Sequence, residues 1–130
     1  MHERLIELGT RFVDSRGSIQ NILTRIEGED EPIRHIAIIT SREYTWRGSH
    51  YHKVGGQWIY VIEGLMTSES IIADESARMS PVHKLTVPEG SLLYCPPGVA
   101  HRYRFDADTT FLNIDTAPRG QGQDTYPFTF

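Results

Sequence analysis

Three histidines and one glutamine have the residue types and spacing of a metal site. His50 and His52 form a His-x-His pair, Gln57 follows five positions later, and His101 ends a Pro-Pro-Gly-Val-Ala-His segment. Side chains in a β-strand alternate between two faces, so both histidines of the pair point to the same side. Three imidazoles and one oxygen donor suit Zn²⁺, Fe²⁺, Mn²⁺, Ni²⁺ or Co²⁺. The pattern predicts a site for one divalent ion, assembled from two separate hairpins.

Gln57 lies at an odd offset from His52, which would reverse its face in a regular strand. Gly55 and Gly56 between them can supply a turn or bulge that resets the alternation. An amide oxygen can coordinate a metal but carries no charge, so four neutral ligands would leave the charge of the ion uncompensated. Such a site favours an anionic or enolate-like ligand. The alternative for Gln57 is a hydrogen-bonding role beside a site of three histidines.

The elements that must position these residues are short strands separated by turn signals. Clusters of Gly, Pro, Asp and Ser recur about every eight to twelve residues, which is typical of an all-β sandwich or barrel. Strands are expected at Arg11–Val13, Ser18–Leu23, Ile33–Thr40, Gln57–Ile62, Leu65–Ile72, His83–Val87, Ser91–Cys95, His101–Phe105 and Phe111–Asp115. Terminal strands within Arg4–Val13 and Tyr126–Phe130 could pack on the same barrel or on a partner subunit. Only the first few residues and Asp74–Met79 allow a short helix.

The same alternation separates interior from exterior side chains. Counting from Gln57 and His101, the residues expected to face inward are Ile59, Val61, Tyr103 and Phe105, and those expected to face outward are Trp58, Tyr60, Arg102 and Arg104. Tyr103 is therefore a candidate for acid–base catalysis and for substrate binding, with core packing as the alternative. Arg47 precedes the His-x-His pair at the expected rim, where it could bind an anionic substrate or form a surface ion pair.

Composition limits the kinds of partner. With 130 residues and neither a linker nor an internal repeat, the sequence indicates one domain spanning 1–130. A net charge of −4 argues against binding to nucleic acid or to an anionic membrane. The single cysteine, Cys95, suits a reducing compartment, and no apolar run has membrane-spanning length. We therefore expect a cytoplasmic protein whose partner is a small molecule.

Both ligand-bearing segments resemble the two sequence motifs of the cupin superfamily. The first motif is matched by Gly48, His50, His52, Gln57 and Gly64, and the second by the stretch from Gly90 to His101, with its Pro-x-Gly and final histidine. The usual glutamate of the first motif is Gln57 here, and the asparagine that often follows the second is Phe105. The resemblance implies an all-β single-domain cupin (a double-stranded β-helix, or jelly-roll barrel) with a metal inside one mouth. It also implies a homodimer.

Two stretches look like segments of nucleotide-sugar cupins, the deoxysugar 3,5-epimerases and the 3,4-ketoisomerases. They are Phe12–Ile19 and Arg47–Lys53, the second followed by Gln57. This resemblance implies that His50 and His52 move a proton beside a sugar ketone, generally without a metal. It also implies that Arg47 contacts the phosphate or the sugar. His101, in contrast, is typical of metal-binding cupins, and no tyrosine matches the catalytic tyrosine of the ketoisomerases.

Three functions follow as hypotheses. The first is a metal-assisted isomerase or epimerase of a carbohydrate, in particular a nucleotide sugar, in which the ion polarises a carbonyl and a base moves the adjacent proton. The second is an Fe²⁺-dependent dioxygenase acting on a small organic substrate. The third is a non-catalytic cupin that binds a sugar or another small molecule.

Overall fold

Residues 2–23, 32–73, 81–116 and 124–130 are described by a computed structural model, and they form strands, turns and loops without a helix. The strands are β1 Arg4–Ile6, β2 Phe12–Asp14, β3 Gly17–Ile19, β4 His35–Ser41, β5 Trp46–Tyr51, β6 Gln57–Glu63, β7 Leu65–Ile72, β8 His83–Pro88, β9 Leu92–Cys95, β10 Val99–Phe105, β11 Thr109–Asp115 and β12 Tyr126–Pro127. The predicted all-β class is confirmed. Asp74–Met79, where the sequence allows a short helix, lies outside the described residues. None of the described segments is the long apolar helix with which a chain crosses a membrane.

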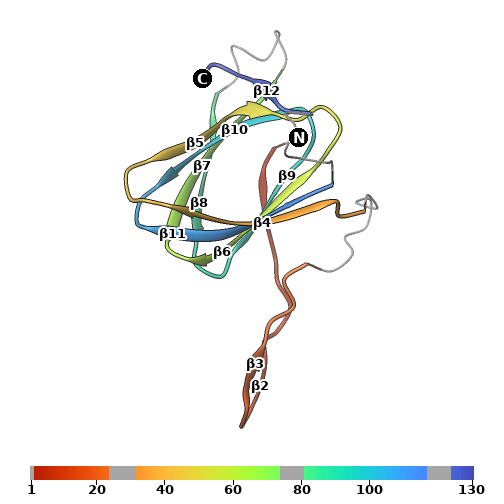
Figure 1. Cartoon of the computed structure of the whole chain (residues 1–130), viewed down its shortest axis with the longest axis vertical. Coiled ribbons are helices and arrows are strands. Elements are labelled where there is room, and N and C mark those ends of the chain that lie inside the picture. The colour runs from red at the N-terminus through yellow and green to blue at the C-terminus, as the bar shows by residue number, and fades with distance from the viewer. Residues whose placement is uncertain (1, 24–31, 74–80, 117–123) are drawn as a thin grey trace.

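Two five-stranded antiparallel sheets face each other in the body of the molecule (Figure 1). One has the order β1-β9-β6-β11-β4 and the other β12-β5-β10-β7-β8. The chain changes sheet after β4, β5, β6, β8, β9 and β10, and because the strands are antiparallel the turns after β4, β6, β8 and β10 lie at the same end of the sandwich, as in a jelly roll. The ladders of the described residues form two sheets and not one continuous barrel. The remaining pair, β2 and β3, forms a hairpin of its own.

The core between the sheets follows the alternation expected from the sequence. Its buried members are Ile59, Val61, Met66, Val87, Leu93, Tyr103, Phe105 and Phe111. A second cluster, Trp58, Leu92, Tyr94 and Ile114, lies on the outer face of the first sheet and is covered by Ile6, Leu8, Ile22 and Leu23. The predicted inward and outward faces of β6 and the predicted inward face of β10 are therefore confirmed.

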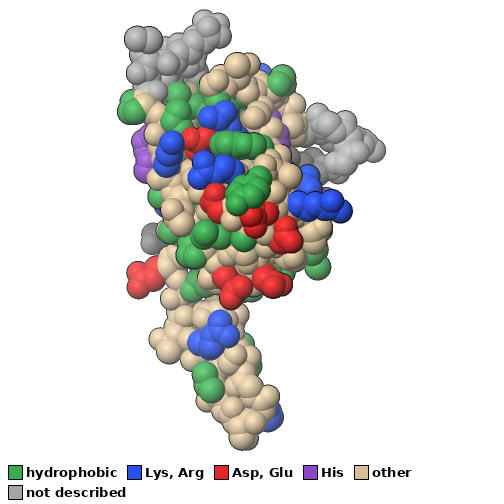
Figure 2. Space-filling model, turned by 90° about the vertical axis from the view of Figure 1, so that its left-hand side faces the viewer, with side chains coloured by type: hydrophobic (Ala, Val, Ile, Leu, Met, Phe, Trp, Pro, Cys, Tyr) green, Lys and Arg blue, Asp and Glu red, His purple; other side chains and the backbone are tan. Residues whose placement is uncertain are grey.

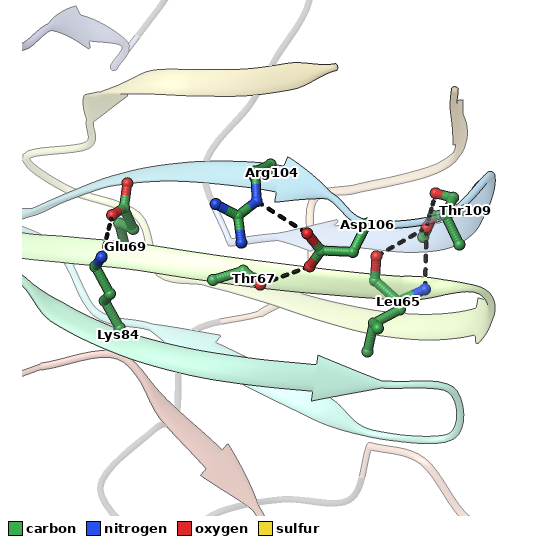
Figure 3. Close-up of polar contacts among 8 residues, drawn as sticks. Leu65, Thr67, Glu69, Lys84, Arg104, Asp106 and Thr109 are labelled. Carbon is green, nitrogen blue, oxygen red and sulfur yellow. Dashed lines mark hydrogen bonds and ion pairs between the residues drawn. The ribbon is translucent and has the colours of Figure 1, made fainter. Parts of the chain in front are cut away.

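Charged side chains occupy the outer face of the second sheet. Arg102 of β10 donates to Glu69 of β7, which is its cross-strand neighbour. Lys84 approaches the same carboxylate, while Arg104 and the hydroxyl of Thr67 both donate to Asp106 (Figure 3). Each arginine of β10 thus faces outward, as expected, and the intervening residues are left to face the interior.

The β2–β3 hairpin extends away from the two sheets as a separate arm (Figures 1 and 2). A strand was expected at Ser18–Leu23, but β3 ends at Ile19. The difference arises because Ile22 and Leu23 pack on the outer apolar cluster instead of pairing in the hairpin. The arm keeps Phe12, Val13 and Ile19 exposed.

Candidate active site

The three histidines meet at the end of the sandwich where β5 ends and β10 begins. His50 and His101 are direct cross-strand partners, and His52 follows the last residue of β5. Their ring centroids are 4.8 to 5.3 Å apart, and one nitrogen of each lies within 4.8 Å of the others. His52 and His101 are buried, whereas His50 is half-buried. The three imidazoles grouped by sequence spacing are therefore brought together.

Gly48 allows the two histidine-bearing strands to approach. It has a φ of 100°, and a Cβ at this position would lie only 2.8 Å from the carbonyl oxygen of His101. The pairing of β5 with β10 shifts register between His101 and Arg102, which marks a bulge. The following Ser49 also has a positive φ, of 60°. This irregular strand sets His50 opposite His101.

The C-terminal segment holds the loop that carries His52. The backbone carbonyl of Asp124 lies 2.6 Å from His52 Nδ1. Since a carbonyl only accepts hydrogen bonds, Nδ1 carries the proton and the neutral ring has its lone pair on Nε2. The Asp124 carboxylate accepts from the amides of Lys53, Val54 and Gly55 at 2.8 to 3.2 Å. Burial opposes ionisation of Asp124, but these bonds outweigh it and lower its pKa.

The amide of Gln57 is oriented by a chain of hydrogen bonds along the interior of the first sheet. Gln57 Nε2 donates to Asn113 Oδ1, and Asn113 Nδ2 donates to Asp115 Oδ2 at 2.8 Å. The same Asp115 oxygen lies 3.1 Å from Nδ1 of His35. Gln57 Oε1 is buried and has no hydrogen-bond partner among the described residues. The oxygen is thus the end of the side chain that remains for a ligand.

Gly55 and Gly56 were predicted to form the turn or bulge that changes the face of the chain between His52 and Gln57, and they lie in a loop. Both residues lie between β5 and β6, and neither has a positive φ. Gly56 is needed for another reason, because a Cβ there would lie 2.8 Å from the hydroxyl oxygen of Tyr94. The loop starts β6 at Gln57 with its side chain on the interior face.

Residues of β9 and β10 contact His101 at its Nδ1 and on one face of its ring. Its Nδ1 lies 3.1 Å from Cys95 Sγ and 3.3 Å from the carbonyl oxygen of Val99. The ring of Tyr103 stacks on the imidazole, with centroids 5.1 Å apart and an angle of 15° between the planes. The candidate Tyr103 is therefore adjacent to the histidines, but it is also part of the core.

Glu3 is a buried residue of this region that sequence reasoning missed. Only 1% of its surface is exposed, and its carboxylate accepts hydrogen bonds from the hydroxyls of Ser68 and, at 2.8 Å, Tyr103. Desolvation raises its pKa from 4.5 to about 7, although these bonds oppose the shift. No local pattern distinguishes Glu3 from the exposed Glu7. Its burial depends on strands that come much later in the sequence.

Arg47 points toward β4 and not toward the imidazoles. Its Nε donates to Ser41 Oγ at 2.6 Å and its Nη2 to the carbonyl of Thr40 at 3.0 Å. Together with Arg42, Trp46 and other residues it lines a cavity of about 620 Å³, where β4 ends and β5 begins. The role of Arg47 in binding a substrate stays a prediction.

Comparison with solved structures shows which fold surrounds this site. No family model and no curated protein matches the sequence. The chain is similar to dTDP-4-dehydrorhamnose 3,5-epimerase from Sulfolobus tokodaii, with 18% identity, a TM-score of 0.75, and coverage of 100% of this chain and 84% of the other. A 3,4-ketoisomerase from Helicobacter canadensis is 16% identical, with a TM-score of 0.77 and coverage of 96% of this chain and 90% of the other. A variant of a 3,4-ketoisomerase from Thermoanaerobacterium thermosaccharolyticum was solved in complex with TDP-4-keto-6-deoxyglucose. It is 18% identical, with a TM-score of 0.70 and coverage of 95% of this chain and 86% of the other.

These likenesses define the fold as that of a cupin, and the predicted fold is confirmed. The predicted similarity to nucleotide-sugar 3,5-epimerases and 3,4-ketoisomerases is confirmed at the level of the fold. At such low identities a shared fold does not transfer an activity, which must be argued from the site itself.

Proposed function

We propose that the chain is an isomerase or epimerase of a nucleotide-linked keto sugar. The observation that carries the proposal is the convergence of His50, His52 and His101 at one end of a cupin fold. Two of these side chains are buried and one is half-buried, so a substrate entering from solvent meets imidazoles that have little access to water. Several structural neighbours are enzymes of this reaction class, and one was solved with TDP-4-keto-6-deoxyglucose.

The histidines supply the base that such a reaction needs. A ketone acidifies the C–H bonds on its neighbouring carbons, and a base that removes one proton leaves the electron pair delocalised onto the ketone oxygen as an enolate or enediolate. His52 is suited to this step because a proton on Nδ1, held by the carbonyl of Asp124, places the basic lone pair on Nε2. His50, whose ring centroid is 4.9 Å from that of His52, can return or relay the proton.

The point at which the proton returns decides the product. Return to the opposite face of the same carbon inverts that carbon, which is epimerisation. Ketoisomerisation results when the proton returns to the former carbonyl carbon. The neighbouring hydroxyl then loses its proton as its carbon becomes the new ketone, and the former ketone oxygen gains a proton and becomes a hydroxyl. Both outcomes use the same base and the same enediolate. The product therefore depends on which groups flank the sugar.

The donor set also fits a divalent transition metal. Three imidazoles converge, and the buried Oε1 of Gln57 lacks a hydrogen-bond partner among the described residues. As the alternative to a free base at His52, we propose His50, His52, His101 and Gln57 as the ligands of such an ion, with Zn²⁺, Fe²⁺, Mn²⁺, Ni²⁺ and Co²⁺ as candidates. The two roles of His52 exclude each other, because coordination and proton removal both use the lone pair on Nε2. A bound ion would act as a Lewis acid on the ketone oxygen. Gln57 can alternatively hydrogen-bond to the substrate beside a three-histidine site.

Solvent exchange tests the activity directly. The chain is incubated with TDP-4-keto-6-deoxyglucose in deuterated buffer, with and without each metal, and the sugar is followed by proton NMR. We expect loss of the signal from a carbon next to the ketone and the appearance of an epimer or ketoisomer. His52→Ala should lower the rate by at least about a hundredfold. His83→Ala, a histidine outside the cluster, is the matched control.

Other outcomes would redirect the assignment. Absence of exchange in the wild-type protein under all metal conditions would overturn the proposed isomerase. Oxygen consumption that requires Fe²⁺ and stops under argon would favour the dioxygenase. Thermal stabilisation by the sugar nucleotide without any product would favour a binding cupin.

A further inference from the structure

Glu3 reaches the interior because the segment before β1 enters between the sheets. β1 pairs with β9 over three residues, with Arg4 opposite Tyr94. The side chain of Glu3, one position earlier, lies near Cys95, which contributes a hydrogen bond to its carboxyl group. Two further donors, both hydroxyl groups, come from the other sheet: Ser68 of β7 and Tyr103 of β10. One carboxyl group therefore joins three strands of both sheets at the level of the histidines.

Two of the groups that contact Glu3 are the groups that hold His101. Cys95 Sγ lies 3.1 Å from His101 Nδ1, and the Tyr103 ring stacks on the imidazole. One carboxyl oxygen of Glu3 also lies within 4.8 Å of a ligand atom of Cys95 and of His101. If the Tyr103 hydroxyl lost its hydrogen bond to Glu3, the Tyr103 ring could move, and the His101 imidazole would lose the packing contact on one of its faces.

We propose that Glu3 is a positioning residue of the histidine site, which holds Tyr103 and Cys95 against His101 and so fixes the orientation of that imidazole. The inference rests on the proposed function of the site and assigns part of it to the segment before β1. Glu3 acts through its neighbours and touches no substrate. Partners that orient a functional histidine typically change affinity or activity by about 10- to 100-fold when they are removed.

The orientation of His101 can be measured without a substrate. Long-range proton–nitrogen NMR of histidine-labelled protein reports which ring nitrogen carries the proton, and His101→Ala assigns the signals. We expect one Nδ1-protonated form of His101 in the wild type, the same form in Glu3→Gln, which keeps an oxygen acceptor, and a mixture of forms in Glu3→Ala. Glu7→Ala, which changes an exposed glutamate directly after β1, should leave the spectrum unchanged.

Turnover provides the second readout. Glu3→Ala and Tyr103→Phe should each lower kcat by about tenfold. Because both changes break the same hydrogen bond, the double variant should be little worse than either single one. If Glu3→Ala does not fold, Tyr103→Phe, which loses only the hydroxyl, provides the same test.

The two proposals fail in different ways. An unchanged His101 signal in Glu3→Ala, or additive effects of Glu3→Ala and Tyr103→Phe on kcat, would overturn the positioning role. Lack of turnover in the wild-type protein would overturn the isomerase alone, since the NMR signature still reports on Glu3.

Discussion

Each buried imidazole of the site has Nδ1 near a backbone carbonyl. His52 faces the carbonyl of Asp124 and His101 that of Val99. Contacts of this kind select one tautomer and place the lone pair on the other nitrogen, which is how proteins prepare histidines as bases or as metal ligands. The chemistry of these residues is therefore set as much by main-chain atoms as by the His-x-His spacing.

Removal of either buried imidazole should weaken metal binding. His52→Ala and His101→Ala each delete one of the proposed ligands, and the remaining neutral donors should bind a divalent ion at least about tenfold more weakly. Inductively coupled plasma mass spectrometry after reconstitution measures the ion, and circular dichroism verifies the strands. His83→Ala is the control, since His83 stacks on His2 and lies outside the cluster. Stoichiometric metal in both site variants would refute the four-ligand assignment.

Glu3 should give the free energy of unfolding a distinctive dependence on pH. Its pKa is raised from 4.5 to about 7 in the folded protein, so the folded state binds more protons than the unfolded state between these values. The stabilisation from this group is fully present below a pH of about 4.5 and is lost as the pH rises to about 7. The shift corresponds to roughly 3 kcal/mol.

Urea unfolding of the wild type and of Glu3→Gln isolates this dependence. The variant cannot ionise, so its stability relative to the wild type should increase by up to roughly 3 kcal/mol from a pH of about 4.5 to about 8. Glu7→Gln, at an exposed position of the same segment, should show no such trend. A difference between wild type and Glu3→Gln that stays constant with pH would show that Glu3 does not change its proton affinity on folding.

β5 and the loop after it are the elements that position the site, and their geometry follows from one glycine. Gly48→Ala should separate β5 from β10, because its Cβ would meet the His101 carbonyl at 2.8 Å. We expect the free energy of unfolding to fall by about 2 kcal/mol or more, together with weakened metal binding.

Gly90 provides the matched comparison for Gly48. It also has a positive φ, of 80°, but a Cβ there would meet nothing within 4 Å. Gly90→Ala should therefore cost only the backbone strain of about 1 kcal/mol and leave metal binding intact. Equal effects of the two substitutions on the histidine site would contradict a special role for the close approach at Gly48.

The hydrogen bonds from the loop after β5 to the Asp124 carboxylate give a further prediction. Asp124→Ala removes the acceptor for the amides of Lys53, Val54 and Gly55, so the loop and His52 should become mobile. We expect a rate of solvent exchange into the sugar lower by about tenfold, with little change in β-sheet content. Asp14→Ala, which removes a carboxylate from the turn of the exposed hairpin, should leave the exchange rate unchanged.

The regular elements were predictable because their periodicity is local, and the irregular ones were not. Alternation correctly separated Ile59 and Val61 from Trp58, and strand Leu65–Ile72 was predicted with its observed bounds. The span of β5 was not predicted, because Gly48 and Ser49 interrupt its backbone geometry. The His-x-His pair was nevertheless expected to lie in a strand, which is correct for His50, whereas His52 follows the last residue of β5.

The candidate site was predictable only where its residues carry a motif. The convergence of the histidines follows from two spacings that match known motifs. Glu3, Asn113 and Asp124 carry no such signal, because their roles come from contacts between segments that are distant in sequence. A single sequence cannot reveal such contacts when each residue type is common at the surface.

The molecule as a whole exposes apolar surface on two separate parts, and we expect a homodimer that covers it. The arm leaves Phe12, Val13 and Ile19 between 57% and 68% exposed, and the β4 edge of the first sheet leaves Ile36 and Ile38 61% and 69% exposed. Exposed apolar groups of this extent are typical of interaction surfaces. The arm points away from the body of the molecule (Figure 2), and we expect a second copy of the chain to cover it.

Light scattering coupled to gel filtration measures the expected dimer. Phe12→Asp places a charge on the face of the arm that Phe12 shares with its cross-strand partner Ile19, and it should shift the mass to that of one chain. Ser15→Asp, at the turn of the same hairpin, adds the same charge and should leave the dimer intact. A wild-type protein with the mass of one chain at micromolar concentrations would refute the dimer.

The histidine site should form late in folding, because residues near both ends of the described chain hold it in place. Strands β4 to β11 pair with one another in the two sheets, whereas Glu3 and Asp124 come from opposite ends of the described chain and contact residues that those pairings set in place. The contact of Glu3 with Tyr103 spans 100 positions of the chain, and both terminal segments can attach only where the sheets already provide their partners, so these contacts should form late. Refolding should therefore restore β-sheet circular dichroism before it restores the ability to bind a metal or a sugar nucleotide, with a sheet-rich intermediate that lacks both.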